Sequence, residues 1–216
     1  MTSDDRPAPD TTAPTTTPAS ADAQASDDAQ ASDDAQASDD AQVTDGAQTP
    51  DDGGPVARAD LEALADQLGR VPRGVVSIAA RCRHGRPTVV RTLPRLEDGT
   101  PFPTSFYLTC PPATRAVSTL EAEHVMADMQ ARLHEDPELQ AAYTAAHEDY
   151  LARRSELGDV PEIAGVSAGG MPERVKCLHA LFAHTLAVGR GINPFGDEAL
   201  DLLKERGMWS PETCTC

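Results

Sequence analysis

The spacing of apolar residues predicts one helix and then three strands in the first half of the folded region. Residues 58–68 place apolar side chains three and four apart, which predicts a helix ending at Gly69. Residues 75–83 alternate apolar and polar side chains, and 88–92 return after a His-Gly turn, so these segments predict a β-hairpin. Residues 106–109 predict a third strand. The alternation assigns four residues to the inner face of the first strand: Val76, Ile78, Ala80 and Cys82.

In the second half of the folded region, the apolar residues have the spacing of helices. Residues 113–157 are predicted to be helical, with a restart at an Asp-Pro pair. A glycine-rich turn at 165–170 is followed by Pro172, which suits the first position of a helix. This long, apolar helix is predicted to end at Gly189, and 198–206 form a last helix.

An acidic segment of low complexity precedes these elements. Residues 1–54 contain 13 Asp and one Arg, so they carry −12 of the chain's net charge of −17. They lack aromatic residues and repeat Ala-Gln-Ala-Ser-Asp-Asp, which predicts disorder because too little apolar surface is available for burial. We therefore predict a disordered tail at 1–56, a single α+β domain at 57–206 with a small antiparallel three-stranded sheet packed against several helices, and a C-terminal tail at 207–216 with a Cys-x-Cys pair.

The five cysteines are predicted to be free thiols. No apolar run approaches the length of a signal peptide or a membrane span, so we expect a cytoplasmic protein. Thiols stay reduced in that compartment, which argues against a disulfide scaffold. The cysteines are then core residues, metal ligands or nucleophiles.

A thiolate-bound metal is the sharpest chemical hypothesis. In an antiparallel meander Cys82 and Cys110 lie at the same end of the sheet, and Cys177 lies on the buried side of the long helix. Thiolates suit zinc or an iron–sulfur cluster. His179 should point about 160° away from Cys177, and His184 lies seven residues after Cys177, so neither histidine is expected to share an ion with Cys177. The predicted ligand candidates are Cys82, His84, Cys110, Cys177, Cys214 and Cys216.

Two other interpretations of these residues remain open. Free cysteines are commonly small core residues without chemistry. Alternatively, Cys177 is a reactive thiol with His179 or His184 as its base, which would suit a small hydrolase or transferase beside the glycine turn. No spacing of nucleophile and base in the sequence identifies a reaction.

Arginines in the hairpin predict contact with an anion. Seven arginines and no acidic residue lie between Asp66 and Glu97, and we single out Arg81, Arg83 and Arg91. The partner would be a nucleic acid, a polyphosphate or an acidic protein surface. The alternatives are ion pairs with acids of the helices, or occupation by the acidic tail.

The glycine turn is a second candidate for anion binding. Backbone N–H groups that converge at a helix start attract anions. The residues of this candidate pocket are Gly169, Gly170, Arg174 and Lys176. The alternative is an ordinary connector.

Five segments together resemble a known family: GRVPRGVVSIAARCRHGRPTVVRT, LEDGTPFPTSFYLTCP, HEDYLARR, GGMPERVKCLHALFAH and GINPFGDEAL. Over roughly residues 60–205 they are similar to the actinobacterial domain-of-unknown-function family numbered 501. The resemblance implies cytoplasmic proteins without an assigned activity, often encoded near enolase, a septum-formation initiator and an exopolyphosphatase. It implies no catalytic residues.

These observations favour a metal-stabilised binding or regulatory domain, with zinc or an iron–sulfur cluster held by cysteines and the arginine hairpin facing an anionic partner. The small hydrolase or transferase is the first alternative. A protein-interaction scaffold without metal is the second.

Overall fold

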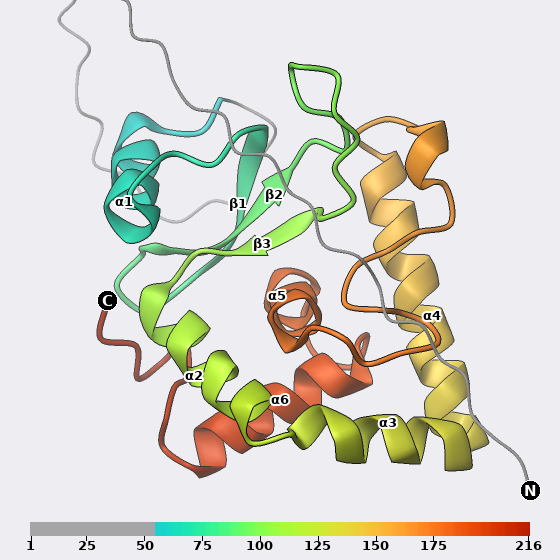
Figure 1. The fold of residues 1–216 in the computed structure, drawn as a ribbon. Coiled ribbons are helices and arrows are strands. Elements are labelled where there is room, and N and C mark those ends of the chain that lie inside the picture. Colours follow the sequence, from blue (N-terminus) through green and yellow to red (C-terminus); the bar gives the residue numbers. More distant parts are fainter. Residues whose placement is uncertain (1–54) are drawn as a thin grey trace, which may run out of the picture. The chain divides into compact units, whose positions relative to one another are not determined.

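Residues 55–216 are described in the computed structural model, and they form a three-stranded antiparallel sheet with six α-helices (Figure 1). The predicted disorder of the acidic segment 1–54 lies outside the described residues. Within the described part, no helix has the length and apolar character needed to cross a membrane. The elements in chain order are α1 (Arg58–Leu68), β1 (Val75–Arg81), β2 (Pro87–Thr92), β3 (Phe106–Leu108), α2 (Pro111–Ala122), α3 (Val125–Glu135), α4 (Pro137–Ser155), the short 3-10 helix η1 (Pro161–Ile163), α5 (Leu178–Val188) and α6 (Pro194–Glu205).

The sheet confirms the predicted α+β class and the meander. Its strand order is β1-β2-β3, and both neighbouring pairs are antiparallel. The predicted inner face of β1 is wrong, however. The register shifts at three places in β1, between Val75 and Ser77, between Ile78 and Ala80, and between Ala80 and Arg81, so regular alternation does not hold along the strand. Cys82 lies just beyond the strand and belongs to the main core, whereas Ile78 packs with α1.

Helices cover both faces of the sheet. Leu64 of α1 packs with Ile78 and Val90 in a small cluster on one face. The main core joins Phe106 of β3 to Phe182 of α5, and Figure 1 shows α5 lying between the sheet and α6. Six of the eleven residues of α5 are buried, which explains why its sequence is apolar on nearly every side.

α5 begins at Leu178, so the predicted helix start at Pro172 is wrong. The chain folds back on itself before the helix: the carbonyl of Gly169 accepts the N–H of Lys176 at 2.7 Å, and that of Gly170 accepts the N–H of Arg174 at 2.9 Å. A Cβ on Gly170 would lie 2.6 Å from the Arg174 carbonyl oxygen, so this close approach requires glycine. The glycine turn consequently does not lie at the start of a helix.

α5 and α6 approach each other closely at Gly196. A Cβ at this position would lie 2.3 Å from the Leu181 carbonyl oxygen and 2.3 Å from Thr185 Oγ1. The side chain of Asn193 caps α6, because its Oδ1 accepts the N–H of Gly196 at 3.0 Å. The start of α6 is therefore fixed against the middle of α5.

Residues 207–216 pack against the domain rather than extending from it. Trp209 is buried, and its ring lies edge-on to Phe182 with the centroids 5.5 Å apart. The N–H of Arg83 donates to the Pro211 carbonyl at 3.1 Å, which joins this segment to the β1–β2 turn. The chain consequently ends near that turn and the start of α2 (Figure 1).

Candidate metal centre and a second thiol site

A tight turn after β1 places Cys82 at the edge of the core. The Cys82 N–H donates to the Arg86 carbonyl at 3.1 Å, and the Gly85 N–H donates to the Cys82 carbonyl at 2.8 Å. Gly85 adopts a φ of 73°, a left-handed conformation that glycine takes without steric cost. The predicted His-Gly turn is confirmed, and Cys82 is buried behind it.

Four cysteine sulfurs gather where this turn meets the C-terminal segment. The sulfur of Cys216 lies 3.1 Å from that of Cys82 and 3.1 Å from that of Cys214, and all three lie within 4.8 Å of one another. The sulfur of Cys110, the N-cap residue of α2, is 3.6 Å from that of Cys214 but falls outside the mutual set. We call Cys82, Cys110, Cys214 and Cys216 the sulfur cluster.

The surroundings favour ionisation of Cys214 over that of Cys110 and Cys216. Burial opposes ionisation of Cys214, yet hydrogen bonds, first from Cys216, hold the pKa of Cys214 below its usual range. Burial raises the pKa of Cys110 to about 11 and also raises the pKa of Cys216. The buried Nε1 of Trp209 has no hydrogen-bond partner among the described residues, although the indole favours the thiolate forms of Cys110 and Cys214. An N–H donor beside the cluster suits a centre that carries negative charge on sulfur.

Two of the predicted metal ligands lie elsewhere. A ring nitrogen of His84 faces the carbonyl oxygen of Cys214 at 3.1 Å, so His84 holds the C-terminal segment rather than joining the sulfurs. Cys177 lies in a different group, in which its sulfur, a nitrogen of His179 and a carboxylate oxygen of Glu121 are mutually within 4.8 Å. The expected convergence of Cys82, Cys110 and Cys177 is therefore wrong.

The second thiol site consists of Cys177, His179 and Glu121. The prediction that His179 points away from Cys177 is wrong, because Cys177 is the N-cap of α5 and lies in an extended conformation outside the helix. His179 Nδ1 is 3.1 Å from Glu121 Oε1, and Nε2 is 3.2 Å from the Thr114 carbonyl. Hydrogen bonding with Cys177 raises the pKa of His179 to about 9, and the same bond lowers the pKa of Cys177.

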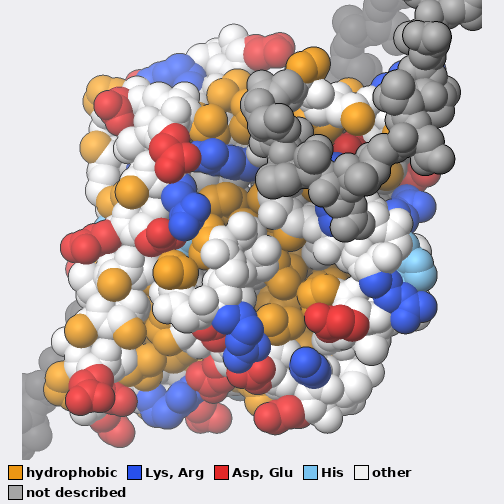
Figure 2. All heavy atoms as spheres, turned by 180° about the vertical axis from the view of Figure 1, so that it is seen from behind, with side chains coloured by type: hydrophobic (Ala, Val, Ile, Leu, Met, Phe, Trp, Pro, Cys, Tyr) orange, Lys and Arg blue, Asp and Glu red, His pale blue; other side chains and the backbone are white. Residues whose placement is uncertain are grey.

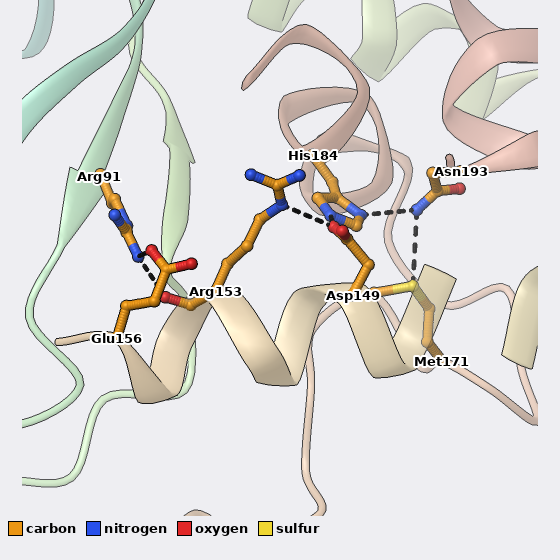
Figure 3. A network of polar contacts seen from close by, with 7 residues as sticks. All are labelled: Arg91, Asp149, Arg153, Glu156, Met171, His184 and Asn193. Carbon is orange, nitrogen blue, oxygen red and sulfur yellow. Dashed lines mark hydrogen bonds and ion pairs between the residues drawn. The ribbon is translucent and has the colours of Figure 1, made fainter. Parts of the chain in front are cut away.

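His184 belongs to a buried network that is separate from Cys177 (Figure 3). Its Nε2 lies 2.9 Å from Asp149 Oδ2, which Arg153 also contacts at 2.8 Å, and its Nδ1 lies 3.3 Å from Asn193 Nδ2. Burial lowers the pKa of His184, so the neutral ring donates from Nε2 and accepts at Nδ1. Both ring nitrogens are thus engaged, and His184 holds α4, α5 and the start of α6 together.

Sequence reasoning missed the residues that complete these two sites. Asn193 precedes Pro194, a pairing typical of a helix N-cap, and this local signal would have identified it had it been used. Glu121 and Asp149 lie on polar helix faces with no local sign of their partners, which are 58 and 35 residues away.

All three arginines singled out in the hairpin have partners within the domain. Arg81 pairs with Asp60 at 2.6 Å and Arg91 with Glu156 at 2.7 Å, while Arg83 donates to the Glu212 carbonyl at 3.0 Å. Arg73 and Arg95 also form ion pairs, with Asp98 and Glu162. On the face drawn in Figure 2, basic and acidic side chains are interspersed rather than gathered by sign. This arrangement favours the alternative in which the hairpin arginines pair with acids of the same domain.

The glycine turn does not present the expected anion pocket. The carbonyls of Gly169 and Gly170 accept N–H groups from the residues that follow, and the helix begins only at Leu178. Arg174 and Lys176 are exposed in the segment that leads from this loop to α5. The convergence of backbone N–H groups at a helix start, on which the prediction depended, is not found there.

The described residues define a small α+β domain with a sulfur cluster at one end of its sheet and a second thiol site at the start of its central helix. The chain belongs to the DUF501 family of proteins of unknown function, whose family model matches residues 78–201. No curated protein matches the chain, and no solved structure matches it. The matched range includes Cys82, Cys110 and Cys177 but ends before Cys214 and Cys216.

Proposed function

We propose that this protein is a metal-stabilised binding domain in which one zinc ion fastens residues 207–216 to the β1–β2 turn. Cys82, Cys214 and Cys216 would hold the ion. The observation that carries the proposal is the approach of these three sulfurs, from segments more than 130 residues apart, to within 4.8 Å of one another.

The spacing of the sulfurs supports a single ion rather than a cluster of several metals. Four thiolates at about 2.3 Å from one tetrahedral zinc lie about 3.8 Å apart. The observed gaps of 3.1, 3.1 and 3.6 Å are shorter than that spacing, so the sulfurs would move apart by up to about 0.7 Å to hold one ion, whereas the ligands of an iron–sulfur cluster are distributed over separate irons. Cys110 already contacts Cys214, and a small shift of its sulfur would supply the fourth ligand.

A metal in this position would regulate the C-terminal segment. Binding requires deprotonated thiols, and the free energy of binding adds to that of folding because the unfolded chain does not gather the ligands. Without metal, the segment is held by Trp209 and by hydrogen bonds to Arg83 and His84. The domain would therefore expose its core near Phe182 more readily in the metal-free state. An anionic partner of the hairpin stays a prediction with weaker support, given the ion pairs of its arginines.

Metal analysis of the full-length, tag-free chain tests the proposal. We expect roughly one zinc ion per chain in freshly isolated protein, and loss of this ion in Cys82→Ser and Cys216→Ser. The matched control is Cys177→Ser, which removes a thiol outside the sulfur cluster and should leave the metal content unchanged. Chelation should lower the thermal unfolding temperature of the wild type and leave that of Cys216→Ser unaltered.

Two results would contradict a metal-stabilised domain. One is a zinc and iron content below roughly a tenth of an ion per chain in protein kept under reducing conditions. The other is equal metal content in the wild type and Cys216→Ser. A mass two hydrogens below that of the fully reduced chain would instead identify a disulfide within the sulfur cluster.

A further inference from the structure

We propose that Cys177 is a nucleophilic thiolate that undergoes exchange with small-molecule disulfides, with His179 as the proton donor and Glu121 as the residue that positions His179. This second site shares no residue with the sulfur cluster. It gives the chain a covalent modification site in addition to the proposed metal centre.

The backbone presents the Cys177 thiol at a favourable place. Cys177 is the N-cap of α5, where the positive end of the helix dipole stabilises a thiolate. The residue is partly exposed, so a small reagent can reach its sulfur. The loop before it is fixed, because the Gly169 carbonyl accepts the N–H groups of Lys176 and Cys177. Helix dipole and exposure together are the conditions under which thiols react.

The surroundings of His179 favour the doubly protonated imidazolium. Its Nδ1 faces the Glu121 carboxylate at 3.1 Å, and its Nε2 faces the Thr114 carbonyl and the Ser118 hydroxyl oxygen, each at 3.2 Å. The Ser118 hydroxyl donates its proton to the Thr114 carbonyl, so all three oxygens act as acceptors toward the ring, and only an imidazolium donates from both nitrogens. A ring with two N–H groups has no lone pair for a metal, so this geometry favours a thiolate–imidazolium pair over a second metal site.

Glu121 holds the imidazolium beside the thiol. Its Oε1 accepts the N–H of Leu178 at 2.8 Å as well as facing His179 Nδ1, so one oxygen is tied to the first residue of α5. The carboxylate comes from the last turn of α2, and it therefore fixes His179 from a separate helix. Its negative charge also favours the protonated ring.

The exchange step balances without a further reactant. The Cys177 thiolate attacks one sulfur of the disulfide, a new S–S bond forms, and the original S–S bond breaks. The leaving thiolate takes a proton from the His179 imidazolium and departs as a thiol, leaving His179 neutral. The product is a mixed disulfide on Cys177.

The mixed disulfide should persist once it has formed. The other four cysteines form the sulfur cluster, and among the described residues no contact joins Cys177 to another thiol. No internal thiol is therefore placed to displace the attached group. An external thiol would be required to restore Cys177.

Peptide mass spectrometry of the full chain treated with bis(2-hydroxyethyl) disulfide tests this inference. The probe is uncharged, and trypsin releases residues 177–190 as a peptide whose only cysteine is Cys177. An ordinary thiol is ionised to roughly 0.3% at pH 6, so its reaction is slow there. We expect the wild-type Cys177 to react at least about tenfold faster at pH 6 than Cys177 in His179→Asn, with the two rates converging near pH 9.

A second measurement keeps the proposal testable if His179→Asn does not fold. NMR titration should show His179 protonated at pH 7 in the wild type and with a lower pKa in Cys177→Ser. The proposal is overturned by equal rates in the wild type and His179→Asn at pH 6, by a rate profile with the midpoint of an ordinary thiol near about pH 8.5, or by a neutral His179 at pH 7. The metal content of Cys177→Ser is a separate readout, so failure here leaves the proposed metal centre standing.

Discussion

Replacement of Gly196 by alanine should separate α6 from α5. The added Cβ would lie 2.3 Å from the Leu181 carbonyl oxygen and from Thr185 Oγ1, against an ordinary contact of 3.4 Å or more. Leu181 contributes backbone, which cannot rotate away, so the helices must move apart by about 1 Å. That movement would also strain the Asn193 cap and its contact with His184.

The expected loss of stability is about 2 kcal/mol. Overpacking of this kind costs about 1–3 kcal/mol, and the upper part of that range applies because the clash involves backbone. Alanine gains up to about 1 kcal/mol over glycine in a helix, which offsets part of the cost. For a domain of this size about 2 kcal/mol corresponds to a fall in Tm of about 4–8 °C.

Thermal unfolding followed by circular dichroism measures this effect, with urea unfolding for the free energy. Glu205→Ala is the control, since it is an exposed substitution near the end of the same helix and should change stability by less than about 0.5 kcal/mol. A Gly196→Ser variant should be at least as unstable as Gly196→Ala. A Tm for Gly196→Ala within about 1 °C of the wild type would refute the close approach of the two helices.

Three further outcomes follow from buried groups. Arg154 donates to the carbonyls of Ile163 and Val166, so Arg154→Met should cost about 1.5–3 kcal/mol in urea unfolding. Trp209→Ala should cost about 3–5 kcal/mol, whereas Trp209→Phe should retain much of the packing; equal losses in calorimetry would contradict this. Burial lowers the pKa values of His184 and His147 from 6.5, so the unfolded chain binds protons that the folded chain does not. The unfolding free energy should therefore fall as the pH drops below about 6.5, and less steeply in His184→Asn; a constant value from about pH 7.5 to 5.5 would exclude this.

The spacing of apolar residues was sufficient to predict the helices and strands whose boundaries are set by residues close in sequence. The helix at 58–68 and the three-strand meander were predicted from spacing and turn residues alone. The three register shifts in β1 could not be predicted in this way, because alternation assumes a regular strand. The prediction that Ile78 and Cys82 share one face of the sheet was therefore wrong.

The sites depended on contacts that local patterns do not contain. Pro172 resembled a helix start, but the loop before α5 is set by Gly169 and by packing against Leu181. Once Cys177 lay outside the helix, the angular argument that separated it from His179 no longer applied. Cys214 and Cys216 were among the predicted ligands, since thiols are recognisable wherever they occur, but their approach to Cys82 depends on the burial of Trp209.

A single rigid element connects the two groups of thiols. Cys110 stands directly before the first turn of α2, and Glu121 lies in its last turn, about 16 Å along the axis. A helix moves as a rigid unit. A metal ion that drew Cys110 toward the other cysteines would therefore also displace Glu121, whose carboxylate faces His179. The reaction of Cys177 with disulfides would then depend on whether a metal ion is bound by the four cysteines at the opposite end of the helix.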